Sequence, residues 1–385
     1  MGKTLTEIAQ KLHDANKRVQ LIYAFNGAGK TRLSREFKQL VAPEKRDSDA
    51  DADNQPEPPC SKIRYYNVFT EDLFYWDNDL SQDAEPKLKI QRNSFTDWLL
   101  RLLRDLGQDG NIFRYFQHYA NDKLTPHFTE DFSEVTFSLK RVNDERSGNL
   151  KISKGEQSNF IWSVFYTLLD QAISTLNVVE PENRETSQFD QLEYVFIDDP
   201  VSSLDENHLI ELAVNLASLI KTSPTVLKFV ITTHSALFYN VLHNELGLKK
   251  SGNKEDCYLL DRLVDGTFDL NVKYGDSNRS FSYHLHLKKT LDQAIAADEV
   301  ERYHFTLLRN LYEKTASFLG YREWSELLPD DKKTYLNRII QFTNHSNLSD
   351  ETVAEPTPQE RQTVKFLMDH LVGNYGFWQQ EQQNG

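Results

Sequence analysis

The sequence predicts an α/β domain built on a parallel sheet, followed by a mainly α-helical domain. Three apolar, strand-like runs alternate with helical patterns in the N-terminal part, which is typical of a wound parallel sheet. These runs cover 19–23, 194–197 and 226–232. From residue 281 onward the pattern is helical, and the composition shifts near Lys250. A chain of 385 residues is long enough for two domains, which we expect at 1–254 and 255–385.

Composition and charge restrict the functional classes. A hydrophobic content of 39% with 12% aromatic residues is typical of a folded, core-forming chain. The net charge of −14 argues against indiscriminate binding to nucleic acid, so an RNA or DNA partner has to be recognised locally. There is no run of about 18 apolar residues and no signal-peptide pattern, and Cys60 and Cys257 form no disulfide or metal-binding pattern. We therefore expect a soluble cytoplasmic protein without a membrane partner.

The first strand-like run leads into the stretch around which the chain is organised, a glycine-rich loop followed by a helical pattern. The loop reads Ala24-Phe25-Asn26-Gly27-Ala28-Gly29-Lys30-Thr31. Such a P-loop wraps its backbone N–H groups around phosphates, while the lysine reaches the β/γ oxygens and the threonine hydroxyl binds Mg²⁺. Ala24 stands where the motif usually has its first glycine, a position that tolerates the change. We expect nucleotide contacts from Asn26, Gly27, Ala28, Gly29, Lys30 and Thr31, with Thr31 also on the metal.

Both helical and strand-like sequence patterns occur on the two sides of this loop, up to residue 153. The acidic, proline-rich composition of 42–59 predicts a surface insertion. Helices are expected at 4–17, 98–106 and 112–119, and strands at 62–69 and 135–139. The segment 70–79 is dense in aromatic residues and carboxylates. Two interpretations stay open for it, a packed surface lobe and a contact surface.

Two carboxylates follow the second strand-like run. Asp198 ends this run, the position from which an aspartate holds Mg²⁺ in P-loop enzymes. Asp199 is expected to polarise the water that attacks the γ-phosphate. A helix is expected at 207–220, and His234 comes after the third strand-like run. A lone histidine is more often structural than functional, so the residue type alone leaves the role of His234 open.

A strong helix is expected after Ser153-Lys154-Gly155-Glu156, and two interpretations fit this segment. Ser153 and Glu156 can form a capping box. The segment also resembles the signature sequence of ATP-binding-cassette (ABC) proteins, with Lys154 in place of a glycine. The order along the chain favours the second interpretation. P-loop, signature, Asp198-Asp199, Ser202-Ser203-Leu204-Asp205 and His234 follow one another as in ABC proteins.

The resemblance implies an ABC-type nucleotide-binding domain that works as a dimer. It places Ser153, Gly155, Glu156, Asp205 and His234 among the nucleotide contacts. In ABC proteins the signature of one subunit closes the P-loop of the other, so a homodimer around two nucleotides is expected. The family usually has glutamate at the position of Asp199, and the shorter side chain suggests slow hydrolysis, which suits a switch. The absence of a long heptad run disfavours the Rad50 and SMC proteins.

The C-terminal part predicts a hairpin and then helices. The hairpin is expected at 257–274 with its turn at 265–266, and the helices at 281–297, 299–319, 331–343 and 358–372. Arg309 and Glu313 lie four residues apart, so they share one helix face, and His345 follows the next helix.

The side chains of Arg309, Glu313 and His345 could together catalyse RNA cleavage without a metal. Cleavage by the RNA's own 2′-OH needs a base, an acid and a cation at the phosphate, and glutamate, histidine and arginine fill these roles. Residue type alone leaves alternatives open. Arg309 and Glu313 could form a surface ion pair, and His284, His286 and His304 are rivals to His345.

Over its whole length the chain resembles the PrrC family of bacterial anticodon nucleases. The most specific matches are 69–79, 273–278 and Arg309-Asn310-Leu311-Tyr312-Glu313. The resemblance implies an ABC-type NTPase joined to a ribonuclease that cuts the tRNA anticodon loop, typically of tRNA-Lys, 5′ of the wobble base. The ends implied are a 2′,3′-cyclic phosphate and a 5′-OH, made without a metal. The family's catalytic set falls on Arg309, Glu313 and His345, and its tRNA-recognition segment on 273–282, with Lys273, Ser277 and above all Asp276 as contacts.

The same resemblance implies regulation in antiphage defence. A type I restriction-modification complex would keep the nuclease latent, ATP or GTP with Mg²⁺ would gate it, and dTTP would be a regulatory ligand. The self-association would be a dimer or a tetramer built from it. The alternative is an ABC-type ATPase that senses or remodels DNA, as RecF-type proteins do, with a structural C-terminal domain. A metal nuclease of the OLD type would need an acidic cluster after His234, and the sequence has none.

Overall fold

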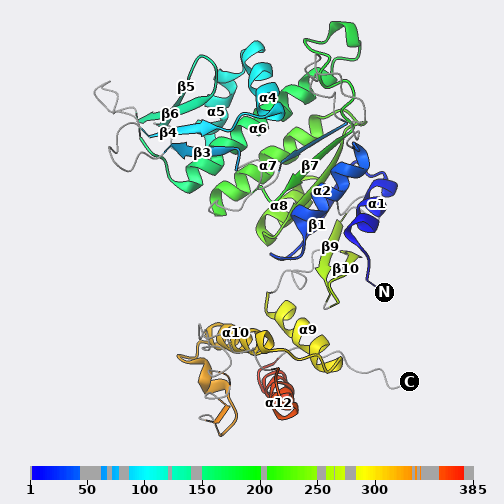
Figure 1. Cartoon of the computed structure of the whole chain (residues 1–385), viewed down its shortest axis with the longest axis vertical. Helices are drawn as coiled ribbons and strands as arrows, with labels where there is room; N and C mark the ends of the chain where they lie inside the picture. The colour runs from blue at the N-terminus through cyan, green and yellow to red at the C-terminus, as the bar shows by residue number, and fades with distance from the viewer. Residues whose placement is uncertain are drawn as a thin grey trace. The chain divides into compact units, whose positions relative to one another are not determined.

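The chain forms two compact units, 1–276 and 277–385, in a computed structural model (Figure 1). The structure describes residues 2–43, 62–66, 72–77, 86–119, 124–139, 150–200, 206–248, 257–263, 265–273, 283–331, 334–335, 339 and 355–376, and every structural statement below concerns these residues. The acidic insertion expected at 42–59 lies almost entirely outside them.

A six-stranded sheet forms the centre of the first unit. Its order is β10 (Phe268–Val272), β9 (Cys257–Arg262), β1 (Val19–Tyr23), β8 (Lys228–Thr233), β7 (Tyr194–Asp198) and β2 (Ile63–Tyr66). All neighbours are parallel except the β9–β10 pair. Strands β1 and β7 are buried along their whole length, as their mainly apolar sequences predict, and Gln20 and Asp198 are their buried polar residues. The predicted wound parallel sheet is confirmed.

The β9–β10 hairpin corrects the predicted domain boundary. A hairpin turning at Gly266, where φ is +78°, is present as expected. The sequence pattern predicts that it belongs to the C-terminal domain, but β9 pairs in parallel with β1, from Leu21 opposite Cys257 to Tyr23 opposite Leu259. The composition shift near residue 250 therefore falls inside the first unit, and the division lies at 276/277 instead of 254/255.

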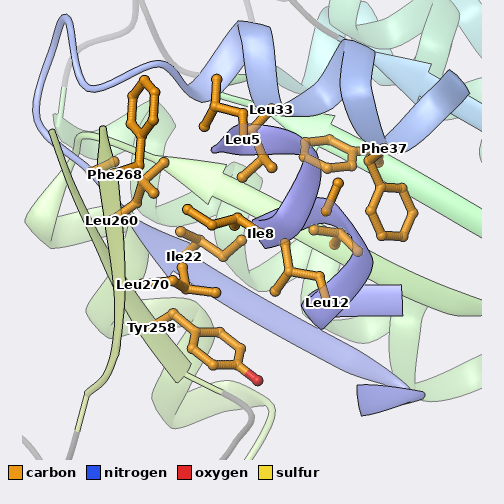
Figure 2. Close-up of a cluster of buried hydrophobic side chains, with 14 of the residues drawn as sticks. Leu5, Ile8, Leu12, Ile22, Leu33, Phe37, Tyr258, Leu260, Phe268 and Leu270 are labelled. Carbon is orange, nitrogen blue, oxygen red and sulfur yellow. The ribbon is translucent and has the colours of Figure 1, made fainter. Parts of the chain in front are cut away.

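One apolar cluster ties the N-terminal helix, the P-loop helix and the hairpin together (Figure 2). Helix α1 (Leu5–Ala15) begins with a Thr4–Glu7 capping box, and α2 (Lys30–Val41) follows the P-loop. Figure 2 shows Ile8 of α1, Phe37 of α2 and Leu260 of β9 converging on this cluster. Each such side chain stabilises the fold by about 1.5–3 kcal/mol when fully buried. The hairpin is thus an integral part of the first unit's core.

A second, antiparallel sheet lies within the same unit, in the order β3 (Phe74–Asp77), β4 (Lys87–Ile90), β6 (Glu134–Leu139) and β5 (Leu124–Phe128). Helices α4 (Ser94–Asp105), α5 (Asp109–Tyr119) and α6 (Lys154–Leu176) accompany it (Figure 1). Strands β3, β4 and β5 were not predicted. Within 70–79, the indole N–H of Trp76 donates to Gln157 Oε1 at 3.0 Å, and Phe74 is buried, which supports the packed-lobe interpretation.

Two further helices belong to the first unit. Helix α7 (Glu206–Thr222) runs between β7 and β8 along the chain, and α8 (Ala236–Glu245) begins just after His234. The helix predicted at 207–220 is confirmed.

The second unit is helical in its described part, as predicted. It contains α9 (Tyr283–Ala296), α10 (Arg302–Leu319), the short 3₁₀ helix η3 (Trp324–Leu327) and α12 (Pro358–Asn374). Its apolar core includes Leu291, Leu308 and Leu367, and the Tyr312 hydroxyl donates to the Leu367 carbonyl at 2.8 Å. Most of the helix expected at 331–343 lies outside the described residues. No described helix is long and apolar enough to cross a membrane.

Candidate functional site

The P-loop has the backbone that its sequence predicts. Gly27 and Gly29 have φ values of +82° and +91°, in the left-handed region where a side chain is strained. The Ala28 N–H donates to the Phe25 carbonyl at 3.1 Å and closes the turn. Ala24 lies outside that left-handed region and donates its N–H to the Thr233 carbonyl at 3.0 Å. Alanine therefore replaces the usual first glycine without backbone strain.

Lys30 lies at the centre of this loop and is buried. Its ammonium donates to the Ala24 carbonyl and to Asn26 Oδ1, both at 3.3 Å, and lies 3.5 Å from Asp199 Oδ2. The sequence prediction that Lys30 and Asn26 belong to one site therefore has a direct geometric basis. A phosphate entering the loop has to compete with Asp199 for the lysine.

Thr31 and Asp198 lie side by side, as a shared Mg²⁺ site would require. The Thr31 hydroxyl donates to Asp198 Oδ2 at 2.6 Å, and the Thr232 hydroxyl donates to Asp198 Oδ1 at 2.5 Å. Burial raises the pKa of Asp198, helped by the neighbouring charge of Asp199, while the two threonine hydrogen bonds act against the rise. A cation at this position would relieve the cost of burying the carboxylate.

Asp199 is the most connected carboxylate of the site. Its Oδ2 lies 2.5 Å from His234 Nδ1, and its Oδ1 accepts from the His234 backbone N–H at 3.3 Å. Burial alone would raise the pKa of Asp199, but the hydrogen bond from His234 and the charge of Lys30 outweigh it, so the pKa is lowered. Its φ of +52° is uncommon for a residue other than glycine, although aspartate tolerates it better than most. Asp199 is therefore held ionised between Lys30 and His234.

Two threonines of this site, Thr232 and Thr233, were not predicted from the sequence. Thr232 lies opposite Asp198 in the parallel β7–β8 register, and the Thr233 hydroxyl lies 3.4 Å from Asp199 Oδ1. Both are fully buried. Neighbouring parallel strands end at the same edge of a sheet, so the polar residues after the apolar run of β8 were the available signal.

The signature-like segment has the capping-box geometry. The Glu156 N–H donates to Ser153 Oγ at 3.2 Å, and the Ser153 N–H donates to Glu156 Oε2 at 2.7 Å. The Lys154 ammonium donates to Gln157 Oε1 at 3.1 Å. The capping-box interpretation is confirmed, and the nucleotide contacts of Ser153, Gly155 and Glu156 stay a prediction. Asp205 lies outside the described residues.

Arg309 and Glu313 form the contact that their spacing predicts. Arg309 Nε donates to Glu313 Oε1 at 2.7 Å, and the two side chains are 33% and 38% exposed. The guanidinium also lies 5.8 Å from the centre of the Trp324 ring, within cation–π range. The pair is thus about one-third exposed and geometrically defined. His345, its predicted partner, lies outside the described residues.

The rival histidines differ in their surroundings. His304 is fully buried, and its Nδ1 accepts the Glu301 backbone N–H at 2.9 Å at the start of α10. Burial lowers the pKa of His304, so it is a neutral helix-capping residue. His284 and His286 are half-buried on α9.

The predicted tRNA-recognition segment is described only at its beginning. Lys273 is buried, with its ammonium 5.2 Å from the centre of the Tyr239 ring. Asp276 and Ser277 lie outside the described residues. A direct contact of the Lys273 ammonium with RNA would require the side chain to leave this ring.

Comparisons with known proteins give a family and a close relative. The model of a family described as "AAA domain" matches residues 111–371, about two thirds of the chain. A curated Escherichia coli protein named "Anticodon nuclease" is 67% identical over 404 aligned positions, which cover 100% of both chains.

Among solved structures, the SMC head domain from Thermotoga maritima is 10% identical, with a TM-score of 0.32, over 67% of this chain and 91% of that one. An SMC head bound to the C-terminal winged-helix domain of ScpA is 13% identical, with a TM-score of 0.32, over 66% and 89%.

Proposed function

The chain belongs to the anticodon nuclease family, an endoribonuclease with a P-loop domain, and from this premise we propose that nucleotide gates its cleavage of tRNA-Lys. The proposed cut lies 5′ of the wobble base and leaves a 2′,3′-cyclic phosphate and a 5′-OH. The observation that carries the proposal is the 67% identity to an anticodon nuclease over the full length of both chains. The proposed setting is antiphage defence in the cytoplasm.

We assign the chemistry to Arg309, Glu313 and His345. Glu313 accepts the proton of the 2′-OH, His345 protonates the leaving 5′-oxygen, and Arg309 neutralises charge on the phosphate. The 2.7 Å contact between Arg309 and Glu313 supports this division of roles. When a phosphate takes over the guanidinium, the Glu313 carboxylate loses its partner and becomes free to accept a proton. The proposed reaction needs no metal, because the three side chains supply base, acid and cation.

We assign the gate to the P-loop domain. Lys30 and the loop N–H groups hold the phosphates of ATP or GTP, Thr31 and Asp198 hold Mg²⁺, and Asp199 orients water with His234 beside the γ-phosphate. Ser153, Gly155, Glu156 and Asp205 complete the site from the other copy of a dimer, which could pair further into a tetramer. The position of Asp199 between Lys30 and His234 supports this assignment. dTTP as a regulatory ligand and a type I restriction-modification complex as the latency partner follow from the family resemblance alone.

We assign tRNA recognition to the segment 273–282. A carboxylate such as Asp276 can accept hydrogen bonds from a modified wobble base, or pair with a cationic group on it. The net charge of −14 supports a local contact of this kind, because the protein has no general attraction for RNA.

The test is incubation of the purified protein with total tRNA, with and without ATP or GTP and Mg²⁺, followed by mapping of both ends of each fragment. We expect cuts confined to the anticodon loop of tRNA-Lys, with cyclic-phosphate ends, that depend on nucleotide. Cleavage spread over many tRNAs, or equal with and without nucleotide, would contradict the specificity or the gate, respectively.

A further inference from the structure

The β9–β10 hairpin touches the nucleotide loop itself. A Cβ added to Gly29 would lie 2.9 Å from Cε1 of Phe268, closer than real Cβ contacts come, so the ring is packed directly on the P-loop backbone. The Arg32 guanidinium, in the first turn of α2, lies 5.7 Å from the centre of the same ring. Figure 2 shows Phe268 of β10 next to Leu5 and Leu33. A side chain at Gly29 would therefore have to displace the Phe268 ring.

Phe268 is also fixed along its backbone. Its N–H donates to the Lys3 carbonyl at 2.8 Å, and its carbonyl accepts the Lys3 N–H at 2.7 Å. On its other edge β10 pairs with β9 from Phe268 opposite Arg262 to Val272 opposite Tyr258, and β9 pairs with β1. A displacement of Phe268 is therefore shared by the whole hairpin instead of being absorbed by one side chain.

The far end of the hairpin is held against a second element of the nucleotide site. The Lys273 N–H donates to the Cys257 carbonyl at 2.8 Å, and its ammonium lies over Tyr239 of α8. The Tyr239 ring meets Tyr23, the last residue of β1, edge-on with centres 6.2 Å apart. Helix α8 starts directly after the His234 loop. Phe268 at one end of β10 thus packs on the P-loop, and Lys273 just after the other end packs on the helix that follows His234.

We infer that the β9–β10 hairpin transmits the nucleotide state of the P-loop to the second unit, and that Phe268 is the positioning residue that couples them. Lys273 is the last described residue before the second unit, which begins at 277. Phosphate binding redirects the N–H groups of the loop and draws Lys30 away from Asp199. The resulting shift at Gly29 presses on Phe268, and the hairpin carries it to the chain segment that enters the second unit. This coupling rests on the proposed nucleotide gate, for which the hairpin would be the connection between the P-loop and the second unit.

The experiment measures amide hydrogen exchange in the full chain, with and without ATP and Mg²⁺, and tRNA cleavage in parallel. In the wild type, nucleotide should change exchange at 27–31, in the hairpin and in α9. Phe268→Leu should keep the change at 27–31 and a nucleotide affinity within about tenfold of the wild type. It should lose the change in α9, and cleavage should no longer respond to nucleotide.

Phe37→Leu is the matched control. It removes an equal ring from the same apolar cluster, but the ring of Phe37 contacts Tyr194 and Phe196, with centres 5.2 and 5.6 Å apart. This variant should lose stability and keep the response of α9. Phe268→Met, whose unbranched and flexible side chain adapts more easily to the space left by the ring, replaces the leucine variant if that variant does not fold.

Two outcomes overturn the inference. One is an unchanged exchange in the wild-type α9 on nucleotide addition, and the other is a response of α9 in Phe268→Leu equal to that of the wild type. Failure of the proposed function is recognised separately, since a wild type that cuts no tRNA would refute the nuclease assignment while the exchange data still decide the coupling.

Discussion

The two candidate sites of this chain are built in opposite ways. The nucleotide site collects Lys30, Asp198, Asp199 and His234 at the ends of three parallel strands and joins them through shared polar contacts, with Lys30 and Asp198 buried and only His234 about one-third exposed. The proposed RNA-cleaving pair comes from a single turn of α10 and stays one-third exposed. Substitutions in the first site should therefore change stability and function together. In the second site they should change function alone.

The largest effect is expected at the exposed pair. Arg309→Ala and Glu313→Ala should each lower tRNA cleavage by about 10²–10⁴-fold, because a positioned base or cation is lost. Their stability should change by no more than about 0.5 kcal/mol, as for other surface ion pairs. Single-turnover cleavage and denaturant unfolding on the same samples measure both.

A matched pair on α9 serves as the control. Lys288 and Asp292 also lie four residues apart, with Nζ and Oδ2 at 2.6 Å. Lys288→Ala should cost similarly little stability and leave cleavage unchanged. Arg309→Lys should fail like the alanine variant, because an ammonium cannot bridge two phosphate oxygens as a guanidinium does. Equal, small losses in all of these variants would make Arg309 and Glu313 a surface ion pair only.

The next largest effect is expected at Lys30. Lys30→Met keeps most of the apolar stem but removes the charge, so nucleotide affinity should fall by roughly 10–100-fold, from a loss of about 1.5–3 kcal/mol. Because Asp199 then loses a buried partner, the free energy of unfolding should also fall, by about 1–3 kcal/mol. Nucleotide titration and denaturant unfolding test this coupling. Loss of nucleotide binding with full stability would show that the comparison between the two sites is wrong.

Some features of the two sites could be predicted from the sequence, and others depend on tertiary structure. The P-loop and the helix that carries Arg309 follow from local patterns, because glycine-rich turns and four-residue spacing act over a few residues. The sequence does not predict which unit the β9–β10 hairpin belongs to, because a hairpin has the same alternation of apolar and polar residues in either unit. The partners of Asp198 and Asp199 depend on the β7–β8 register and on a positive φ at Asp199, which are tertiary properties.

The smallest effect is expected from pH at Asp199. Its pKa is lowered in the folded protein from an ordinary value of 3.8, so its ionised form stabilises the fold. This contribution is fully present above the unfolded pKa and is lost as the pH falls through the folded one. The stability difference between wild type and Asp199→Asn should therefore shrink below about pH 4. Unfolding midpoints from pH 3 to 6 measure it, and a difference that grows on acidification would mean that Asp199 is not held ionised.

A single deoxyribose in the RNA tests the proposed chemistry most directly. Two anticodon stem-loops of tRNA-Lys are compared with ATP and Mg²⁺ present, one all-ribose and one with 2′-deoxyribose immediately 5′ of the cut. If the 2′-OH is the nucleophile, the ribose substrate is cut to a cyclic phosphate and the deoxy substrate is bound but left intact. Cleavage of the deoxy substrate at the same position would require water as the nucleophile and would contradict the assignment of Glu313, His345 and Arg309.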